Sequence, residues 1–186
     1  LIVDGKPVAL TSPRDAITEG IGLVPEDRKQ QALFLSLAIR TNMSIASLDQ
    51  ISSAAGFLSS AKESALVEEY RGLLNIRMAS GDQLVGNLSG GNQQKVVLAK
   101  WLARQCDVLI FDEPTRGIDV GAKYEIYLLM NELVAAGKAI VMISSELPEV
   151  LGMADRILVM HEGRVTGEIA DARRATQEQV MQLAVA

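Results

Sequence analysis

The fold of this chain is constrained most by three short apolar runs, which are Ile21–Val24, Val108–Phe111 and Ala139–Ile143. Apolar runs of this length are consistent with strands buried on both faces, as in parallel sheets. Segments with helical periodicity separate the runs, and parallel strands need crossovers of that kind. The pattern predicts an α/β fold, in which helices flank a largely parallel sheet.

Capping and turn signals place the other elements. Ser12-Pro13-Arg14-Asp15 combines an N-cap, a proline at the first helical position and an acid at the third, which predicts a short helix to about Glu19 that Gly20 stops. We expect Leu1–Leu10 to be a strand with a turn around Asp4-Gly5-Lys6-Pro7, and Pro25–Lys29 to be a charged loop. Further predicted elements are helices over 89–105, 120–135 and 147–153, strands over 156–160 and 165–169, and a capping box at Thr176 and Gln179.

The segment from about Leu37 to Val85 has a different character. Helix-period stretches, of which Ala61–Leu74 is the clearest, are separated by Ser, Gly and Asn, without strand-like alternation. This pattern predicts a helical subdomain inserted into the α/β frame. The predicted division is therefore 1–36 for the first part of the core, 37–86 for the helical subdomain and 87–186 for the rest of the core.

Composition and charge argue against several classes of protein. The net charge is −5, from 18 basic and 23 acidic residues spread along the chain, whereas nucleic-acid-binding proteins usually carry a clustered basic face. No run approaches the roughly 18–20 apolar residues of a membrane span, and no signal-peptide pattern is present, so we expect a soluble, non-exported protein. The lone Cys106 fits a reducing compartment. We expect Cys106 and Trp101 in the core and His161 in a turn.

The strongest local signal for chemistry is the acidic pair Asp112-Glu113, which directly follows the apolar run Val108–Phe111. A central strand of an open α/β sheet delivers the residues at its carboxyl end to the ligand-binding edge. Two carboxylates there suit a magnesium–phosphate site, in which one holds the metal and the other positions the attacking water. The same pattern also fits a strand that runs into a solvated acidic turn.

A second signal lies upstream, in the segment Leu88–Lys95. Ser89 can cap the helix that follows, and Gly90 and Gly91 leave backbone N–H groups unshielded at its positive end. Such a helix start is suited to bind a phosphate. The alternative interpretation is a glycine-rich turn before an amphipathic helix.

Taken together, the two segments resemble the motifs of a known family. Leu88–Gln94 resembles the signature motif of ABC ATPases, Val108–Glu113 resembles their Walker B strand, and Asp119 lies where that family has its D-loop. The stretch Asp112–Lys123 is similar to the second nucleotide-binding domain of monosaccharide-importer ATPases, which carry two such domains in one polypeptide. The resemblance covers essentially the whole chain and implies a P-loop NTPase (RecA-like) fold.

The resemblance implies that the ligands are ATP and Mg²⁺. Glu113 would be the general base that orients water toward the γ-phosphate, and Asp112 would be the magnesium partner. Glu26 stands where the family usually has the glutamine of its Q-loop, a position that contacts the metal and the nucleotide.

The signature motif implies a role in a second site. Ser89, Gly90 and Gly91, together with Gln93, would contact ATP that is held mainly by an opposing domain. Asp119 would help to couple the two sites across that interface. One chain would thus contribute to two composite sites, each of which closes only when two domains meet.

The chain departs from the family pattern at its phosphate loop. Such a loop needs G-x-x-x-x-G-K-[ST], and the nearest candidate is Gly137-Lys138, where Glu132 replaces the first glycine and Ala139 the hydroxyl residue. In the family this loop precedes the segment seen here, so we expect the first strand and the P-loop helix to be missing. Without them we expect the fragment to be inactive.

A further departure concerns the switch histidine of the family, which would fall at Ser145. Serine cannot supply the donor and charge of an imidazole to the γ-phosphate. Together with Glu26 in place of glutamine, Ser145 predicts slow hydrolysis at this half-site.

The resemblance also implies partners and a location. The partners would be a second nucleotide-binding domain, in the same polypeptide or a homodimer, the membrane permease subunits and, indirectly, a periplasmic sugar-binding protein. The chain would lie in the cytoplasm, on the inner face of the bacterial plasma membrane, and couple ATP hydrolysis to monosaccharide uptake. One alternative is a non-catalytic docking or regulatory module that lends its signature loop to a partner. Another is a soluble ABC ATPase that acts on DNA or ribosomes, against which the acidic balance argues.

Overall fold

The computed structural model describes residues 1–3 and 5–185, which form two compact units divided between Val141 and Met142. The strands of the first unit and of its boundary are β1 (Ile2–Val3), β2 (Lys6–Pro7), β3 (Ile21–Val24), β4 (Val108–Asp112) and β5 (Ala139–Ile143). Its helices are α1 (Pro13–Thr18), the π-helix η1 (Arg28–Ala32), α2 (Ile39–Ser44), η2 (Ile45–Ser47), α3 (Leu48–Ile51), α4 (Ser60–Leu73), η3 (Val85–Asn87), α5 (Gly90–Ala103) and α6 (Val120–Ala135). The second unit contains α7 (Leu147–Met153), β6 (Ile157–His161), β7 (Arg164–Ile169), η4 (Ala172–Arg174) and α8 (Gln177–Ala184).

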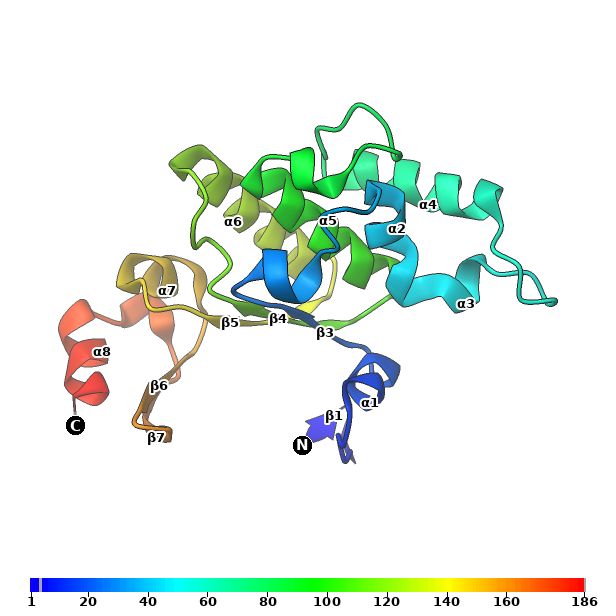
Figure 1. Ribbon diagram of the computed structural model, residues 1–186. Coiled ribbons are helices and arrows are strands. Elements are labelled where there is room, and N and C mark those ends of the chain that lie inside the picture. The colour runs from blue at the N-terminus through cyan, green and yellow to red at the C-terminus, as the bar shows by residue number, and fades with distance from the viewer. Residues whose placement is uncertain (4, 186) are drawn as a thin grey trace. The chain divides into compact units, whose positions relative to one another are not determined.

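A three-stranded sheet in the order β3-β4-β5 carries the α/β core (Figure 1). β3 and β4 pair in parallel, with Ile21 opposite Val108 and Val24 opposite Phe111. Leu109 and Phe111 are fully buried, as expected for a central strand. The three apolar runs therefore form the predicted sheet.

Helix α5 packs on β3 through a close contact between Trp101 and Gly22. The Trp101 indole Nε1 donates a hydrogen bond to the Leu23 carbonyl at 2.6 Å. A Cβ atom at Gly22 would lie 2.9 Å from Trp101 Cγ, so only glycine lets the indole approach this closely. Trp101 thus packs against β3 but is only half-buried, whereas Cys106 is fully buried and lies in the core as predicted.

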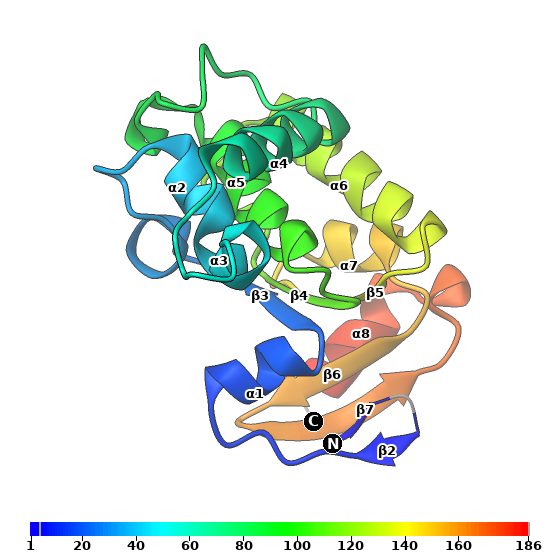
Figure 2. The same cartoon turned by 90° about the vertical axis from the view of Figure 1, so that its right-hand side faces the viewer.

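Helices α2 and α4 pack against each other, and both contact α5 (Figure 2). Asn42 of α2 holds the chain that enters this helical region, because its Oδ1 accepts from Phe34 N at 2.8 Å and its Nδ2 donates to the Ala38 carbonyl at 3.0 Å. Isolated β-bridges join Ala38 to Leu84 and Ser52 to Leu58. The region is helical as predicted, while the three-part division of the chain stays a prediction.

The second unit has its own small core. β6 and β7 form an antiparallel hairpin, which turns at Glu162 (φ 46°) and Gly163 (φ 76°). The core cluster comprises Ile157, Val159, Ala172 and Val180. Thr176 and Gln179 form the predicted capping box at the start of α8.

Several local predictions need correction or limitation. Pro25–Lys29 is not simply a charged loop: Asp27 Oδ1 accepts from Lys29 N and Gln30 N at 3.1 Å, and this cap starts a π-helix that buries Arg28. His161 is the last residue of β6, opposite Arg164, and not a turn residue, because the turn needs only the two left-handed residues that follow. The predicted turn at the N-terminus includes Asp4, which lies outside the described residues.

The predicted cap of the first helix is present in the structure. Ser12 and Asp15 form the predicted capping box with Pro13 at the first helical position, and Gly20 follows α1 with φ 73°. Among the residues that the structure describes, no helix is both long and apolar enough to cross a bilayer.

The contact between Gly22 and Trp101 can be tested by adding one methyl group. Gly22→Ala should lower the free energy of unfolding by about 1–3 kcal/mol, since the new Cβ would overlap the indole. Gly72→Ala in α4 is the matched control, because a Cβ there meets nothing within 4 Å; it should be neutral or stabilising by up to about 1 kcal/mol. Urea unfolding of both variants measures the difference, and equal stabilities would contradict the packing described here.

Lys100 gives a pH-dependent test of the same core. Its Nζ is buried, donates to the Ala32 carbonyl at 3.0 Å and lies 4.8 Å from the centre of the Trp101 ring. Burial lowers the pKa of Lys100 from 10.5 to about 8. The unfolded chain therefore holds this proton more tightly than the folded chain does. Burial of the charged Lys100 amine therefore lowers the free energy of unfolding. This loss is fully present below pH 8 and disappears as the pH rises toward 10.5.

The free energy of unfolding of the wild type should therefore rise relative to that of Lys100→Met between pH 8 and 10.5, by on the order of 3 kcal/mol. Urea titrations at fixed ionic strength measure this difference. The exposed Lys29→Met should show no such trend. A pH-independent difference between wild type and Lys100→Met would show that Lys100 titrates normally.

Candidate functional site

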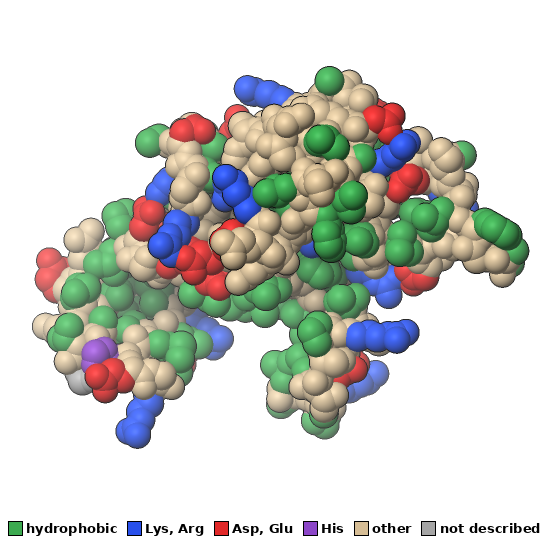
Figure 3. Space-filling model, in the orientation of Figure 1, with side chains coloured by type: hydrophobic (Ala, Val, Ile, Leu, Met, Phe, Trp, Pro, Cys, Tyr) green, Lys and Arg blue, Asp and Glu red, His purple; other side chains and the backbone are tan. Residues whose placement is uncertain are grey.

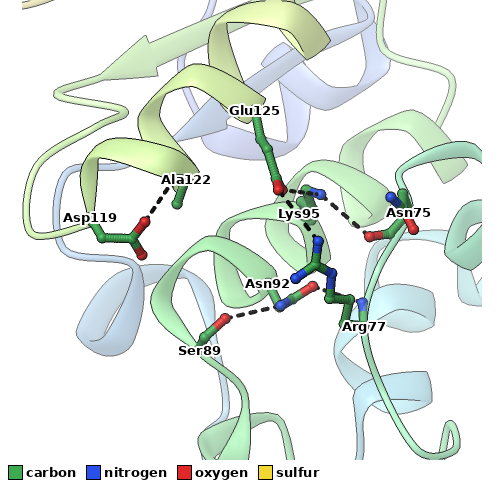
Figure 4. A network of polar contacts seen from close by, with 8 residues as sticks. All are labelled: Asn75, Arg77, Ser89, Asn92, Lys95, Asp119, Ala122 and Glu125. Atoms are coloured by element: carbon green, nitrogen blue, oxygen red, sulfur yellow. Dashed lines mark hydrogen bonds and ion pairs between the residues drawn. The ribbon is translucent and has the colours of Figure 1, made fainter.

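The first part of the candidate site is the N-terminus of α5. Ser89 is the N-cap residue, but its hydroxyl makes no capping hydrogen bond, contrary to the prediction. Instead, Asn92 Nδ2 donates to Ser89 Oγ at 2.9 Å, and Asn92 Oδ1 accepts from Arg77 N at 2.8 Å (Figure 4). Because Ser89 Oγ accepts from Asn92, its own proton can be donated to a ligand. Ser89 is exposed, so such a ligand can reach it.

Gly90 and Gly91 allow α5 to start where side chains of neighbouring elements approach its backbone closely. A Cβ at Gly91 would lie 2.9 Å from Ala122 Cβ of α6, and a Cβ at Gly90 would lie 2.7 Å from Arg28 Nη2. The two glycines therefore permit close packing as well as leaving N–H groups uncovered. Both are half-buried and retain an approachable side, where the N–H groups of the first helical turn have no intrahelical acceptor. The arrangement is suited to bind an anion.

Gln93 points into the protein. It is 3% exposed, and its Nε2 donates to the carbonyls of Leu88 at 3.2 Å and Val85 at 3.4 Å. These bonds fix the chain that leads into α5. This placement does not support the nucleotide contact predicted for Gln93.

The second part of the candidate site is the carboxyl end of β4. Asp112 is the last residue of the strand, and Glu113 follows with φ 45°, in the left-handed region that non-glycine residues rarely occupy. The Glu113 carbonyl accepts from Arg116 N at 3.1 Å, which closes a tight turn. Both acidic residues are half-buried. Strained backbone of this kind occurs often at functional sites.

Glu26 approaches the same edge from the neighbouring strand. β3 ends at Val24, opposite Phe111, so the loop that carries Glu26 leaves the sheet beside the end of β4. The Glu26 carboxylate forms an ion pair with Arg116. A metal ion at Glu26 would have to compete with this guanidinium.

The described residues contain no group of three or more His, Cys, Asp or Glu side chains placed to hold a metal ion. Mg²⁺ is usually held by one or two carboxylates, with phosphate and water oxygens in the other positions. Asp112 at the strand end fits that pattern, and Glu26 fits it only if its ion pair opens. The residues present thus fit a magnesium ion that arrives with a nucleotide.

Asp119 is the N-cap of α6, where its Oδ1 accepts from Ala122 N at 2.9 Å (Figure 4). Its side chain is exposed. Since Ala122 also meets Gly91, the start of α6 lies against the start of α5 within one unit. The structure thus brings the predicted D-loop residue beside the predicted signature motif.

Ser145 lies in the second unit, between β5 and α7, and is exposed. Its neighbour Ser144 accepts from Glu146 N at 3.0 Å and donates to the buried Glu149 carboxylate, which fixes this turn. The two units are described separately, so the role of Ser145 at the position of the switch histidine stays a prediction.

A polar network that the sequence did not reveal holds α5 to α6. The buried Lys95 donates to Glu125 Oε2 at 2.9 Å and to the Asn75 carbonyl at 3.3 Å, and Arg77 lies 3.7 Å from Glu125 (Figure 4). The hydrogen bond from Lys95 is the main reason why the pKa of Glu125 falls below its usual value. The one available signal was a lysine on an apolar helix face, which needs an acidic partner when it is buried.

Known proteins align in sequence with almost the whole length of this chain. The ABC transporter family model matches residues 1–116. The ribose import ATP-binding protein RbsA of Geobacillus kaustophilus is 52% identical over 184 residues, which are 99% of this chain and 37% of the relative. A putative ribose/galactose/methyl galactoside import ATP-binding protein of Agrobacterium fabrum is 47% identical over 99% of this chain and 36% of its own length. The chain thus spans little more than a third of these relatives.

Solved structures agree with the fold. The cbiO1 protein of Clostridium perfringens, described as part of an ABC transporter complex, matches with a TM-score of 0.73 and 25% identity over 96% of this chain and 68% of its own. A nucleotide-free ATP-binding cassette from an ABC transporter matches with a TM-score of 0.75 and 19% identity over 96% of this chain and 70% of its own. These likenesses confirm the predicted fold of P-loop ATPase cassettes. By family model and by relatives of this identity, the chain belongs to the ABC transporter family.

Proposed function

We propose that this chain is part of the second ATP-binding domain of a bacterial monosaccharide importer, which couples ATP binding and hydrolysis at a domain interface to sugar uptake. The observation that carries the proposal is the presence in one unit of a helix start and a strand end that are chemically suited to a nucleotide: the start of α5 with Ser89, and the end of β4 with Asp112-Glu113. Relatives named as ribose import ATP-binding proteins support the choice of an importer over an ATPase that acts on DNA or ribosomes.

The two ends serve two different ATP molecules in this proposal. Ser89, Gly90 and Gly91 offer a hydroxyl and backbone N–H groups to the γ-phosphate of an ATP that a second domain holds. Asp112 and Glu113 act on an ATP bound by their own domain. Asp112 would hold a magnesium ion there, which would neutralise phosphate charge.

Hydrolysis at this half-site depends on Glu113. Its carboxylate orients the attacking water and accepts the water proton as the bond to the γ-phosphate forms. The left-handed backbone at Glu113 turns the chain away from the sheet directly after the strand, which supports a carboxylate directed to the sheet edge. Ser145, at the position of the switch histidine, cannot supply an imidazole, so the proposed rate is low.

The proposed partners are a second nucleotide-binding domain, the permease subunits and, through them, a periplasmic sugar-binding protein. Exposed apolar side chains on the helical region, 37–86, support a protein partner there (Figure 3). These side chains border a groove of about 530 Å³ and include Ile45, Leu48 and Leu58. A permease on this surface would place the chain at the cytoplasmic face of the membrane.

A second candidate is a non-catalytic docking or regulatory module. Within these 186 residues no G-x-x-x-x-G-K-[ST] segment occurs, so these residues alone do not offer the β- and γ-phosphates their usual principal host. Such a module would still lend Ser89–Gly91 to a partner's ATP. Ser145 favours this candidate over fast hydrolysis.

The role of Glu113 can be tested in the complete importer polypeptide. Glu113→Gln keeps the shape but removes the base, so steady-state ATP hydrolysis at this half-site should fall by about 10²–10⁴-fold while ATP remains bound. Glu132→Gln on the exposed face of α6 is the matched control and should behave as wild type. Trapping of radiolabelled ATP and phosphate release measure the two effects. Unchanged turnover and occupancy in Glu113→Gln would favour the regulatory module.

The isolated chain provides a separate test. The purified 186 residues should show negligible magnesium-dependent ATPase activity, since they contain no phosphate-loop sequence. The complete polypeptide assayed under the same conditions is the positive control. Robust turnover by the 186 residues alone would contradict this expectation.

A further inference from the structure

Arg28 is a buried cation beside the start of α5. The residue is 8% exposed, and in the described part of the chain its buried Nε donates to no acceptor. Its Nη2 lies 2.7 Å from the point where a Cβ of Gly90 would stand. The guanidinium thus occupies the space that the absent Gly90 side chain leaves open.

The electrostatic setting of Arg28 is unfavourable in the chain alone. Uncompensated N–H groups and the helix dipole make the start of α5 positive, and a guanidinium next to it adds a like charge. Burial lowers the pKa of Arg28, and the opposing influence comes from Asp27. The Asp27 carboxylate also accepts from Lys29 N and Gln30 N, which divides its charge between several donors.

Neither of the other charged residues next to Arg28 is shown to compensate the guanidinium. Glu26 precedes Arg28 by two residues and forms an ion pair with Arg116. Lys29 follows on the same π-helix and is exposed. An anion at the start of α5 would therefore be attracted both by the Arg28 guanidinium, whose buried Nε has no acceptor, and by the N–H groups of the first turn of α5.

We propose that Arg28 is a further phosphate-binding residue of the signature site, where its guanidinium joins Ser89 and the first N–H groups of α5 on the terminal phosphate of an ATP held by a second domain. The inference rests on the proposed function and deepens it. It links the loop after β3, which carries Glu26, to the site that α5 donates to the partner. A planar guanidinium suits this task because it can give two parallel hydrogen bonds to a phosphate.

The test uses the complete ATPase polypeptide with Mg-ATP. Arg28→Met should raise KM for ATP about tenfold or more, because a charged hydrogen-bond donor is lost from the bound phosphate. Lys29→Met, on the same element, is the matched control and should leave KM unchanged. Arg28→Lys keeps the positive charge but cannot give two parallel hydrogen bonds, and should therefore give a smaller rise in KM. Melting temperatures of all three variants report whether the fold is intact.

The outcomes separate this inference from the proposed function. If Ser89→Ala and Glu113→Gln impair ATP use while a folded Arg28→Met keeps the wild-type KM, the inference is wrong and the function stands. If Ser89→Ala and Glu113→Gln also behave as wild type, the proposed function fails and the inference falls with it. If Arg28→Met does not fold, the test depends on Arg28→Lys. A wild-type KM for ATP in Arg28→Lys would overturn the inference. A raised KM in Arg28→Lys, with a melting temperature equal to that of the wild type, would support it.

Inorganic phosphate distinguishes the source of the anion. It is titrated as an inhibitor of wild type and Arg28→Met. A rise in KM for ATP supports the terminal phosphate as the ligand. Weaker inhibition by phosphate with an unchanged KM would mean that Arg28 binds free phosphate, which contradicts the proposal.

Discussion

The packing of α5 is the contact on which the rest of the structure depends. At its carboxyl-terminal part, Trp101 rests on β3 where Gly22 has no side chain, and at its start Gly91 meets Ala122 of α6. The helix is thereby fixed to the sheet at one end and to the next helix at the other. The ion pair between Lys95 and Glu125 joins the same two helices midway. As a result, the start of α5, the start of α6 and the sheet belong to one unit.

This arrangement supports the proposal that one chain addresses two phosphates. Ser89 and Asp119 stand at the starts of neighbouring helices, whereas Asp112 stands at the end of a strand. Helix starts present N–H groups and positive charge, and this strand end presents carboxylates. The first kind of surface favours the phosphate itself, and the second favours the cation and the water that accompany it.

Much of this could be predicted from the sequence, because the signals are local. Apolar runs fixed the strands at β3, β4 and β5, and capping boxes fixed α1 and α8. The contacts that orient the site are not local: Asn92 reaches Arg77, and Arg28 reaches Gly90, through approaches that no periodicity encodes. For the same reason the inward orientation of Gln93 could not be foreseen, since its partners are backbone carbonyls that any residue could supply.

The left-handed backbone at Glu113 has a consequence for how this protein can change. A glycine at this position would adopt φ 45° without strain, and a glutamate there costs about 1–3 kcal/mol. A chain selected for robustness alone would therefore discard the acidic side chain. If Glu113 has the proposed role, its side chain exchanges some thermal stability for activity, and a variant engineered for higher stability would lose activity first at this turn.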